Sequence, residues 1–428
     1  MVTFLAESPR VEAAMDFDDT EEDAAFRHEV SAWLEANAEV RTGFDDWSRN
    51  PTHPDYVPRC RAWQHTLHEG GWGAVTWPRQ YGGRGESSWH QAIFTQEMAK
   101  YDVSTGAFAV GIGMAGPTLI AHGTEEQKRR HLPAMLRGEA VWCQLFSEPD
   151  AGSDLAGLTT RATRDGEAFV VNGQKVWTSG AQHSDWGILI ARTNQDAPKH
   201  RGITYFLVDM QAPGIEVRPL RQITGSAHFN EVYLTDVVVP VENVVGEIDD
   251  GWSVAHTTMS YERALIGGIG PTISIAQVLD LARRCNKSGD PLVRQQIADY
   301  YTRVQLLRFM NYRVQTALSK GRLPGPEAST TKLFVSQHMG LNGELFMNLA
   351  GANGMLADGA ALDDGFWETA FLNQWSSRLG GGTDNIQRNS LAERVLGLPR
   401  EPRSDKGQPF SETRRATWSD PAQPARNP

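Results

Sequence analysis

Cysteine is scarce in this chain of 428 residues, which has only Cys60, Cys143 and Cys285. Three scattered thiols are too few for a disulfide framework or a cysteine zinc site, and they indicate a reducing compartment. Basic residues are not in excess either, since the formal net charge of -11 argues against a nucleic-acid-binding protein. The sequence also lacks an apolar run of membrane-spanning length, and acidic residues stand near its start where a signal peptide has basic ones. We therefore expect a cytoplasmic protein without a membrane span.

The patterns of several enzyme classes are missing as well. The twelve histidines show no spacing typical of metal ligands, and neither a P-loop lysine nor a Ser-His-Asp set is recognisable. Gly111, Gly113 and Gly116 have the spacing of a dinucleotide-binding loop. However, Pro117 follows at once, and the flanking sequence does not predict a strand-helix-strand unit. We expect neither a metal site nor a Rossmann nucleotide site.

Helical periodicity dominates both ends of the chain. Asp19 to Glu22 form a capping pattern before a predicted helix that runs to Ala36, and Thr124 to Gln127 form a capping box before another. After Gly251 the helical period returns, and Asp290-Pro291 begin a long helix. Its apolar positions recur at steps of four and three, as in the seam of a helix bundle: Val293, Ile297, Tyr300, Val304 and Leu307.

The middle of the chain has the period of strands. Asp165-Gly166 and Asn172-Gly173 are typical hairpin turns, so we predict short strands before, between and after them, with Trp177 on the last. The predicted strands are 159–163, 168–171, 175–177, 186–192, 204–209, 217–220 and 232–239. From about Glu401 the chain is polar and aperiodic, and this tail is expected to be mobile or to lie along a neighbouring molecule.

Two segments carry groups suited to a flavin. Ser147 to Asp154 combine small residues and hydroxyls, which let backbone N–H groups approach an anionic ligand closely. Lys175 to Gly180, about twenty-five residues later, add the flat ring of Trp177 and the hydroxyl of Ser179. An indole can lie against an isoalloxazine, and a hydroxyl can meet a polar ring edge such as N5. Together the segments predict a flavin site.

From about Asp16 to about Glu401, the chain resembles the FAD-dependent acyl-CoA dehydrogenases. Besides these two segments, the resemblance rests on Gly71 to Pro78 with Tyr81-Gly82-Gly83, His122 to Lys128, Phe229 to Val232 with Val237 to Pro240, Gly382 to Asn389, and Ala392 to Pro399. It implies an α+β fold with an N-terminal helical domain (1–140), a central β-barrel-like domain (141–245), a C-terminal four-helix bundle (246–400) and a polar tail (401–428).

The resemblance also implies a reaction and a set of contacts. An acyl-CoA thioester would be oxidised to the trans-2-enoyl form, as in β-oxidation of fatty acids or sterol side chains, and an electron-transfer flavoprotein would take the electrons. The implied flavin contacts are Phe146, Ser147, Gly152, Ser153, Trp177, Ser179, Gly351, Thr383 and Asn385. The residues implied to face substrate are Ser153, Ser260, Arg263 and Gly381.

This reaction needs a carboxylate to remove the α-proton of the thioester. Many family members carry a Glu directly before the Gly-Thr of a C-terminal loop, where this chain has Gly381. Members that resemble isovaleryl-CoA and long-chain dehydrogenases carry the Glu on the first long helix of the bundle, where Glu262 stands before Arg263. The resemblance therefore implies Glu262 as the base.

Helical spacing gives Glu262 an apolar setting. It shares a stripe with Ile266, Ile269 and Ile273, and such surroundings would favour the neutral carboxyl and raise its pKa. The alternative interpretation is a surface Glu-Arg pair. Gly381 keeps a backbone N–H that, in the family, helps to bind the thioester carbonyl as charge develops. The run of glycines at 380–382 either leaves space for a branched or bulky acyl group or is a flexible turn.

The chain departs from the family where the flavin of an adjacent subunit is bound. Arg283 to Asp290 replace an Arg and a Gln-Phe-Gly element, and Asn348 stands where a Gln is usual, before the glycines that begin at Gly351. These departures resemble a bacterial subgroup in which some members pair with a related chain. A homo-oligomer (dimer or tetramer) and a heteromer thus both stay open. Two other functions also stay open, a flavin oxidase or monooxygenase of the same fold and a subunit whose partner supplies the flavin or the base.

Overall fold

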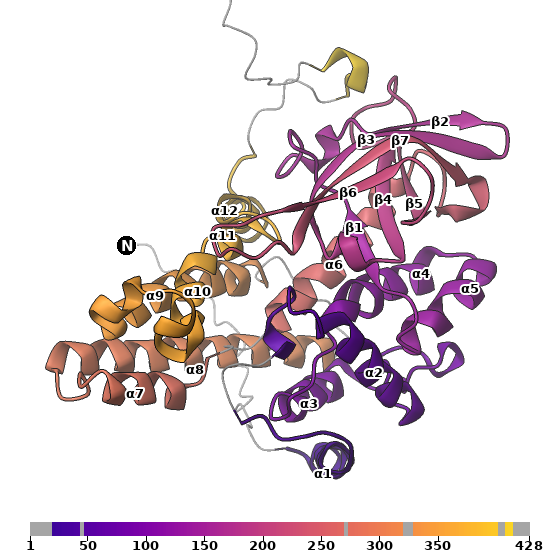
Figure 1. Ribbon diagram of the computed structural model, residues 1–428. Coiled ribbons are helices and arrows are strands. Elements are labelled where there is room, and N and C mark those ends of the chain that lie inside the picture. Colours follow the sequence, from indigo (N-terminus) through magenta and orange to yellow (C-terminus); the bar gives the residue numbers. More distant parts are fainter. Residues whose placement is uncertain (1–18, 43–46, 269–272, 320–327, 401–406, 414–428) are drawn as a thin grey trace, which may run out of the picture.

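The computed structural model describes residues 19–42, 47–268, 273–319, 328–400 and 407–413. The N-terminal part is helical (Figure 1), with α1 (Glu21–Asn37), α2 (Tyr56–Glu69), α3 (Ser88–Met98), α4 (Gly116–His122) and α5 (Glu125–Leu136). The predicted starts of two helices are confirmed. The side chain of Thr20 accepts from the backbone N–H of Asp23 at the start of α1, and Thr124 and Gln127 form both hydrogen bonds of a capping box before α5.

The central part is a single eight-stranded sheet. Its strands are β1 (Trp142–Leu145), β2 (Arg161–Asp165), β3 (Ala168–Ser179), β4 (Trp186–Arg192), β5 (Ile203–Asp209), β6 (Ile215–Leu220), β7 (Phe229–Pro240) and β8 (Val244–Val245). They follow the order β6-β7-β3-β2-β4-β5-β8, and β1 runs parallel to β4. The strands β1 and β8 are additional to those that the sequence predicts.

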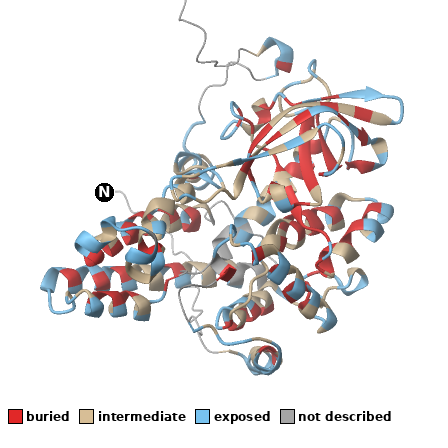
Figure 2. Cartoon of the chain, in the orientation of Figure 1, coloured by how far each residue is buried: buried red, intermediate tan, exposed pale blue. Residues whose placement is uncertain are grey.

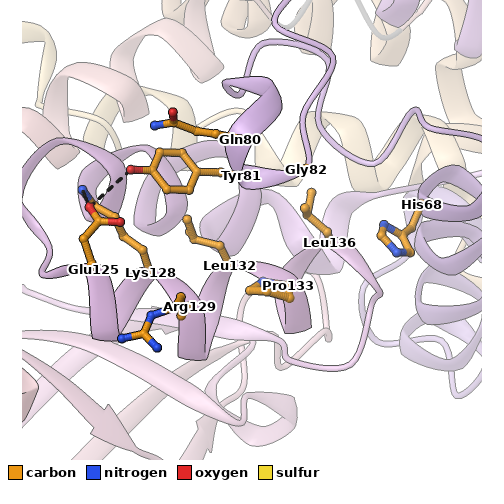
Figure 3. A pocket seen from close by; sticks show the side chains of 10 residues that line it. All are labelled: His68, Gln80, Tyr81, Gly82, Glu125, Lys128, Arg129, Leu132, Pro133 and Leu136. Carbon is orange, nitrogen blue, oxygen red and sulfur yellow. Dashed lines mark hydrogen bonds and ion pairs between the residues drawn. The ribbon is translucent and has the colours of Figure 1, made fainter.

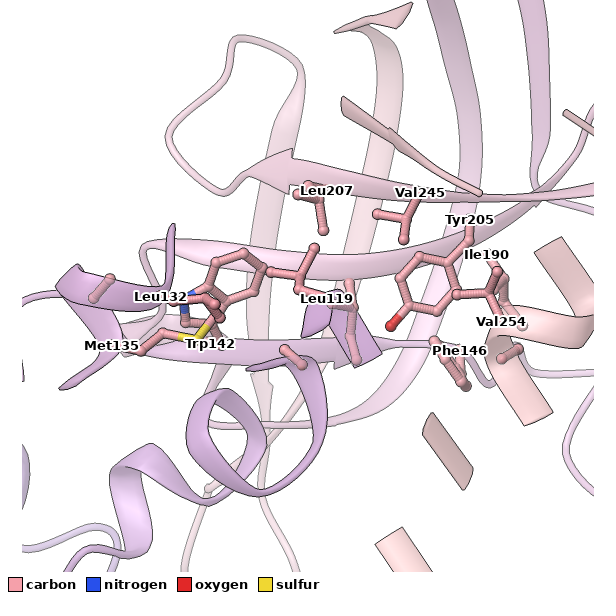
Figure 4. Close-up of a cluster of buried hydrophobic side chains, with 14 of the residues drawn as sticks. Leu119, Leu132, Met135, Trp142, Phe146, Ile190, Tyr205, Leu207, Val245 and Val254 are labelled. Atoms are coloured by element: carbon pink, nitrogen blue, oxygen red, sulfur yellow. The ribbon is translucent and has the colours of Figure 1, made fainter. Parts of the chain in front are cut away.

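Both faces of the inner strands are covered. Along β4, Ile188 and Ile190 pack into a cluster shared with α4, α5 and α6 (Gly251–Gly268), whereas Leu189 and Ala191 join the cluster on the opposite face. Figure 4 shows the first cluster, in which Leu119 from α4 meets side chains of the sheet. A strand that is buried on both faces has a nearly continuous run of apolar residues, and β4 has such a sequence. The buried residues in Figure 2 are accordingly concentrated in the sheet and in the helices against it.

The predicted hairpin turn at Asn172-Gly173 is wrong, because both residues lie inside the continuous strand β3. The ladder between β3 and β7 has an irregularity there, and the Asn172 side chain exchanges two hydrogen bonds of 2.9 Å with Asp236 on β7. A Cβ at residue 173 would lie 2.7 Å from the Cα of Thr160, so glycine is required by close packing. The Asn-Gly pair therefore marks an irregularity in a long ladder. Glycine inside a strand often marks such a bulge or a close approach of another backbone.

The C-terminal part is a helix bundle built from α6, α7 (Ile275–Arg284), α8 (Pro291–Ser319) and α9 (Ala328–Ala350), extended by α10 (Phe366–Asn373), α11 (Ser376–Leu379) and α12 (Asp384–Ser390). The predicted seam of α8 is confirmed, with Val293, Ile297, Tyr300 and Leu307 buried. The predicted stripe of Glu262 is wrong at Ile273, because α6 ends at Gly268 and Ile273 packs with α7 and α8. Ile269 and the side chain of Ile266 lie outside the described residues.

One piece of the polar tail is ordered against its own chain, which corrects the prediction of a mobile tail or one that lies along a neighbour. Pro409 forms an isolated antiparallel bridge with Pro198 in the β domain, and Phe410 is buried. The remainder of the tail, 401–406 and 414–428, lies outside the described residues. Within the parts of the chain that the structure describes, no helix is long and apolar enough to cross a membrane, and no group of three His, Cys, Asp or Glu is placed to hold a metal ion.

Candidate functional site

Trp177 is presented to solvent by a bulge near the end of β3. The ladder with β7 shifts register between Lys175 and Thr178, and Trp177 adopts a φ of 60°, a conformation rare for a bulky residue. Its side chain is 61% exposed, and its ring meets Phe229 edge-on at 6.1 Å. Ser179 ends the strand and is exposed as well. Strain at an exposed aromatic residue is typical of a functional site.

A buried ion pair joins the two flavin segments. Lys175 Nζ donates to Glu148 Oε1 at 2.9 Å and to the carbonyl of Phe146 at 3.0 Å, and the backbone N–H of Val176 donates to Ser147 O at 2.9 Å. Burial favours the neutral form of Glu148, but the Lys175 ammonium and hydrogen bonds from residues 159 and 160 outweigh it and lower the pKa of Glu148 to about 2. Sequence reasoning missed both charged residues, although each lies inside one of the two motifs.

The loop between Glu148 and β2 presents the small residues of the first segment. Gly152 and Ser153 are exposed, and a Cβ built on Gly152 meets nothing within 4 Å. Just beyond Ser153, Lys199 Nζ donates to Asp154 Oδ2 at 2.7 Å. The loop is therefore held by ion pairs at Glu148 and Asp154, whereas its open tip at Gly152 and Ser153 lets a ligand approach the backbone closely.

A second group of predicted residues lies at the start of α12. Gly381 and Gly382 have φ values of 64° and 86°, and both carbonyls accept hydrogen bonds from the side chain of Gln387, at 3.1 Å and 3.4 Å. Thr383 caps the helix by accepting from the N–H of Ile386. Asn385 is exposed and accepts from Arg388 at 3.0 Å. These contacts give the glycine turn a defined shape.

Asp384 fastens this turn to α9. Its Oδ1 accepts from Ser336 Oγ at 2.6 Å and lies 3.4 Å from Lys332 Nζ, and both partners are buried. Burial lowers the pKa of Lys332, and the neighbouring Asp384 carboxylate opposes this effect. Lys332 was not predicted as a site residue, because its distance from Asp384 along the chain leaves no local signal.

Glu262 lies half-buried on α6. Burial raises the pKa of its carboxyl, while a hydrogen bond from Gln144 and the nearby Arg263 charge act in the opposite direction. Gln144 lies on β1, and its Nε2 donates to Glu262 Oε2 at 3.4 Å. The strand β1 leads directly into Phe146 and Ser147. The structure thus brings the predicted base next to the first flavin segment.

Two of the predicted substrate residues, Ser260 and Arg263, lie on the same helix. Arg263 Nη2 donates to Ser260 Oγ at 3.0 Å, and Ser260 Oγ donates to the carbonyl of His256 at 2.8 Å. Burial also lowers the pKa of Arg263, although Glu262 opposes this. Ser260 and Arg263 are therefore in direct contact on α6, and Arg263 lies close enough to Glu262 for their charges to interact.

Gly351 lies far from the turn that carries Thr383. It follows the C-terminal end of α9, whereas Lys332 near the other end contacts Asp384. At a rise of roughly 1.5 Å per residue, the helix from Lys332 to Gly351 spans about 28 Å. Gly351 and Thr383 therefore cannot contact the same small group within one chain. In the same region, Arg284 pairs with Asp280 and Asp363, and Lys287 donates to the carbonyl of Asn348.

A cavity of about 650 Å³ lies elsewhere, between α5 and the loop that carries Tyr81 (Figure 3). Its lining includes the apolar Leu132 and Leu136, and also Glu125 and Lys128, whose charges are paired at 2.9 Å. None of its lining residues is a predicted site residue.

Family models match nearly the whole described chain in three consecutive parts. They are the acyl-CoA dehydrogenase N-terminal domain at residues 20–139, the middle domain at 143–237 and the C-terminal domain at 249–396. This chain belongs to the acyl-CoA dehydrogenase family. The predicted fold class, the enzyme class and FAD as the cofactor are thereby confirmed.

Two curated members of the family are from Mycobacterium tuberculosis. Acyl-CoA dehydrogenase IpdE1 is 38% identical over 383 residues, which cover 88% of this chain and 98% of that protein. Acyl-CoA dehydrogenase FadE34 is 42% identical over 342 residues, which cover 79% of this chain and 46% of that protein.

One chain from each of two solved complexes shares this fold over its full length. A steroid acyl-CoA dehydrogenase, Tcur3481-Tcur3483, has a TM-score of 0.78 at 30% identity and covers 90% of this chain and 100% of its own. The ChsE4-ChsE5 complex from Mycobacterium tuberculosis has a TM-score of 0.73 at 30% identity, with the same coverage.

The residues of the two segments fit FAD on structural grounds. An exposed indole is held in a strained backbone at Trp177, and the backbone at Gly152 is open to close approach. Between Trp177 and Ser179, the buried hydroxyl of Thr178 has no hydrogen-bond partner within the described part of the chain. The ring system of FAD would be held by Trp177 and Ser179. The polar edges and the phosphates of FAD would be bound by Ser147, Gly152 and Ser153.

Proposed function

We propose that this chain catalyses α,β-dehydrogenation of an acyl-CoA thioester, with Glu262 as the base. The observation that carries the proposal is the position of Glu262, a half-buried carboxyl of raised pKa that is hydrogen-bonded to Gln144 on the strand leading into the first flavin segment. A raised pKa makes a carboxylate a stronger base than one at the surface. FAD, when bound, accepts the hydride that leaves the β-carbon.

The chain's own groups divide the remaining work. Glu262 removes the α-proton, and the bound thioester excludes water from it. The N–H of Gly381 binds the thioester carbonyl as negative charge develops there, and the contacts of Gln387 and Asp384 fix the turn beforehand. Ser153, Ser260 and Arg263 orient the thioester. An electron-transfer flavoprotein then receives the electrons.

We further propose a bulky acyl group, such as a sterol-derived one, as substrate. Two observations support this: the first of the two solved complexes is a steroid acyl-CoA dehydrogenase, and the turn at residues 380–382 has no side chains to fill the space beside the thioester. Each observation concerns the acyl part of the substrate, so a panel of thioesters tests both.

The proposed assembly contains a second, related chain. Both solved complexes join two different chains by name, and the distance between Gly351 and Thr383 implies that these residues serve different flavin sites. Gly351 would then contact a flavin that is held mainly by the partner. A dimer or tetramer of identical chains would use Gly351 in the same way, so the identity of the partner needs its own test.

Anaerobic bleaching of the flavin tests the function directly. The unmodified protein, Glu262→Gln and Glu344→Gln would each be mixed with straight, branched and sterol-type acyl-CoAs. Glu344 is an exposed carboxylate on α9 and serves as the matched control. We expect a thioester to bleach the unmodified protein and the control but not Glu262→Gln. Equal bleaching by Glu262→Gln would disprove the assignment of the base, and rapid oxygen consumption by the reduced protein would favour a flavin oxidase.

A further inference from the structure

The ordered piece of the tail, residues 407–413, is seated on the β domain at several points, and we call it the strap. Pro409 bridges Pro198, the N–H of Phe410 donates to Ala197 O at 2.9 Å, and the N–H of Ser411 donates to Gln195 O at 2.9 Å. The Phe410 side chain is only 5% exposed. The strap is therefore held by backbone hydrogen bonds and by a buried aromatic anchor.

Phe410 covers a buried cation. The guanidinium carbon of Arg192 lies 3.8 Å from the centroid of the Phe410 ring, and Arg192 is 1% exposed. A cation and an aromatic ring attract each other more strongly when water is excluded from both. Phe410 thus stabilises Arg192 in its position at the end of β4.

Arg192 in turn holds the loop that carries Ser153. Its Nη2 donates to the carbonyl of Ala156 at 2.7 Å, and its Nη1 donates to the carbonyls of Lys199 and Arg201 at 3.0 Å and 3.1 Å. Ala156 lies in the short helix η5 (Leu155–Gly157) that closes the Ser153 loop. A continuous series of contacts therefore runs from the C-terminal tail to the predicted flavin and thioester contacts.

We propose that the strap positions this loop for the cofactor and the thioester, with Phe410 as a positioning residue that acts through Arg192. The proposal rests on the proposed function only for the identity of the ligand. The loop would be fixed at both ends, by the Glu148-Lys175 pair at its start and by Arg192 at its end. Its open tip at Gly152 and Ser153 would then be presented in one conformation, which reduces the ordering cost of binding.

Two truncations test the strap without ligand. A chain that ends at Arg400 lacks the strap, whereas a chain that ends at Thr413 keeps it and loses only the residues beyond. In the ligand-free protein, we expect the N–H groups of Gly157 and Leu158, which bond within the loop, to exchange with solvent at least several-fold faster in the shorter chain. Their exchange should be unchanged in the longer chain. Equal exchange in all three proteins would overturn the proposal.

Point variants separate the ring from the rest of the tail. We expect Phe410→Ala to raise the FAD dissociation constant and the KM for the thioester about three- to thirty-fold, with little change in kcat. Phe410→Tyr should restore both values, because it keeps a ring over Arg192. An unmodified protein that binds no FAD even when it is coexpressed with a related chain would count against the proposed function alone, since the exchange measurement does not depend on FAD. Normal FAD affinity and normal KM in Phe410→Ala would overturn the role of the strap.

Discussion

A carboxylate accepts a proton only in its ionised form, so the raised pKa of Glu262 determines the acid side of the pH dependence. Activity is expected to rise with pH as Glu262 ionises, at a pH above that of an ordinary surface carboxyl. The hydrogen bond from Gln144 stabilises the ionised form and lowers the pKa. The pH dependence of kcat/KM therefore depends on a residue of β1 as well as on the base itself.

Replacing Gln144 by Leu should raise the pKa of Glu262 further and move the acid limb of the kcat/KM profile to higher pH. The lost hydrogen bond favours the ionised carboxylate, so its removal predicts a measurable displacement of this limb toward higher pH. The measurement is a pH profile of thioester-dependent flavin bleaching. Gln174→Leu on β3 is the control, since Gln174 bonds Glu231 and Tyr233 and not the base. An unchanged limb in Gln144→Leu would show that Gln144 does not act on the proton.

Glu148 makes a second prediction at the residue scale. Because its folded-state pKa lies near 2, below that of an unfolded Glu, its ionised form stabilises the fold above about pH 4.3, and this contribution is lost as the pH falls toward 2. Glu148→Gln leaves the Lys175 ammonium buried without its counter-charge. We expect the free energy of unfolding to fall by about 3–5 kcal/mol at neutral pH, measured by urea denaturation.

The matched control removes both charges. Glu148→Gln combined with Lys175→Met should lose much less stability than the single change, because an apolar side chain leaves no unpaired charge. If the double variant is as unstable as Glu148→Gln, the loss comes from packing and not from the ammonium. The single variant should also bind FAD more weakly, since the pair joins both flavin segments.

At the scale of elements, α12 depends on α9. Asp384 accepts from Ser336 and pairs with Lys332, so the glycine turn before α12 is anchored through one carboxylate. Asp384→Asn and Lys332→Met should each raise the KM for the thioester, and together they should raise it by less than the product of the single effects, with a coupling of about 1 kcal/mol. Steady-state kinetics over a double-mutant cycle measures this. Fully multiplicative effects would mean that the two residues act separately.

The elements also show which signals the sequence contains. Capping boxes and the seam of α8 depend on residues a few positions apart, and these predictions are confirmed. Asn172-Gly173 has the local chemistry of a turn, but the close approach of Thr160 and the bonds to Asp236 on β7 place it in a long strand. Tertiary contacts decided that case, and no window of local sequence contains them.

At the scale of the whole molecule, motifs predicted the family, and geometry added the connections between motifs. Glu262 and the two flavin segments could be predicted because each lies in a recognisable run of residues. Gln144, Lys332 and Phe410 could not, since each acts on a partner between 52 and 218 positions away in the chain, as in the pairs Gln144-Glu262, Lys332-Asp384 and Arg192-Phe410. Positioning residues of this kind become visible only in the folded chain.

The composition of the assembly gives the last prediction. If a related chain completes the site, the protein purified alone should carry little flavin, and coexpression with a homologous partner should yield yellow protein of two chains. The measurements are the flavin-to-protein ratio and the mass of the complex in solution. A full complement of flavin in an assembly of this chain alone would establish the homo-oligomer instead.

The distance of about 28 Å along α9 has a genetic consequence. Consider an assembly in which Thr383 contacts one flavin and Gly351 contacts another. A disruptive substitution at Thr383 then inactivates one site, and a disruptive substitution at Gly351 inactivates the other. Two copies of the chain, each inactive through one such lesion, would then regain partial activity when they are expressed in the same cell, because some mixed assemblies would contain one undamaged site.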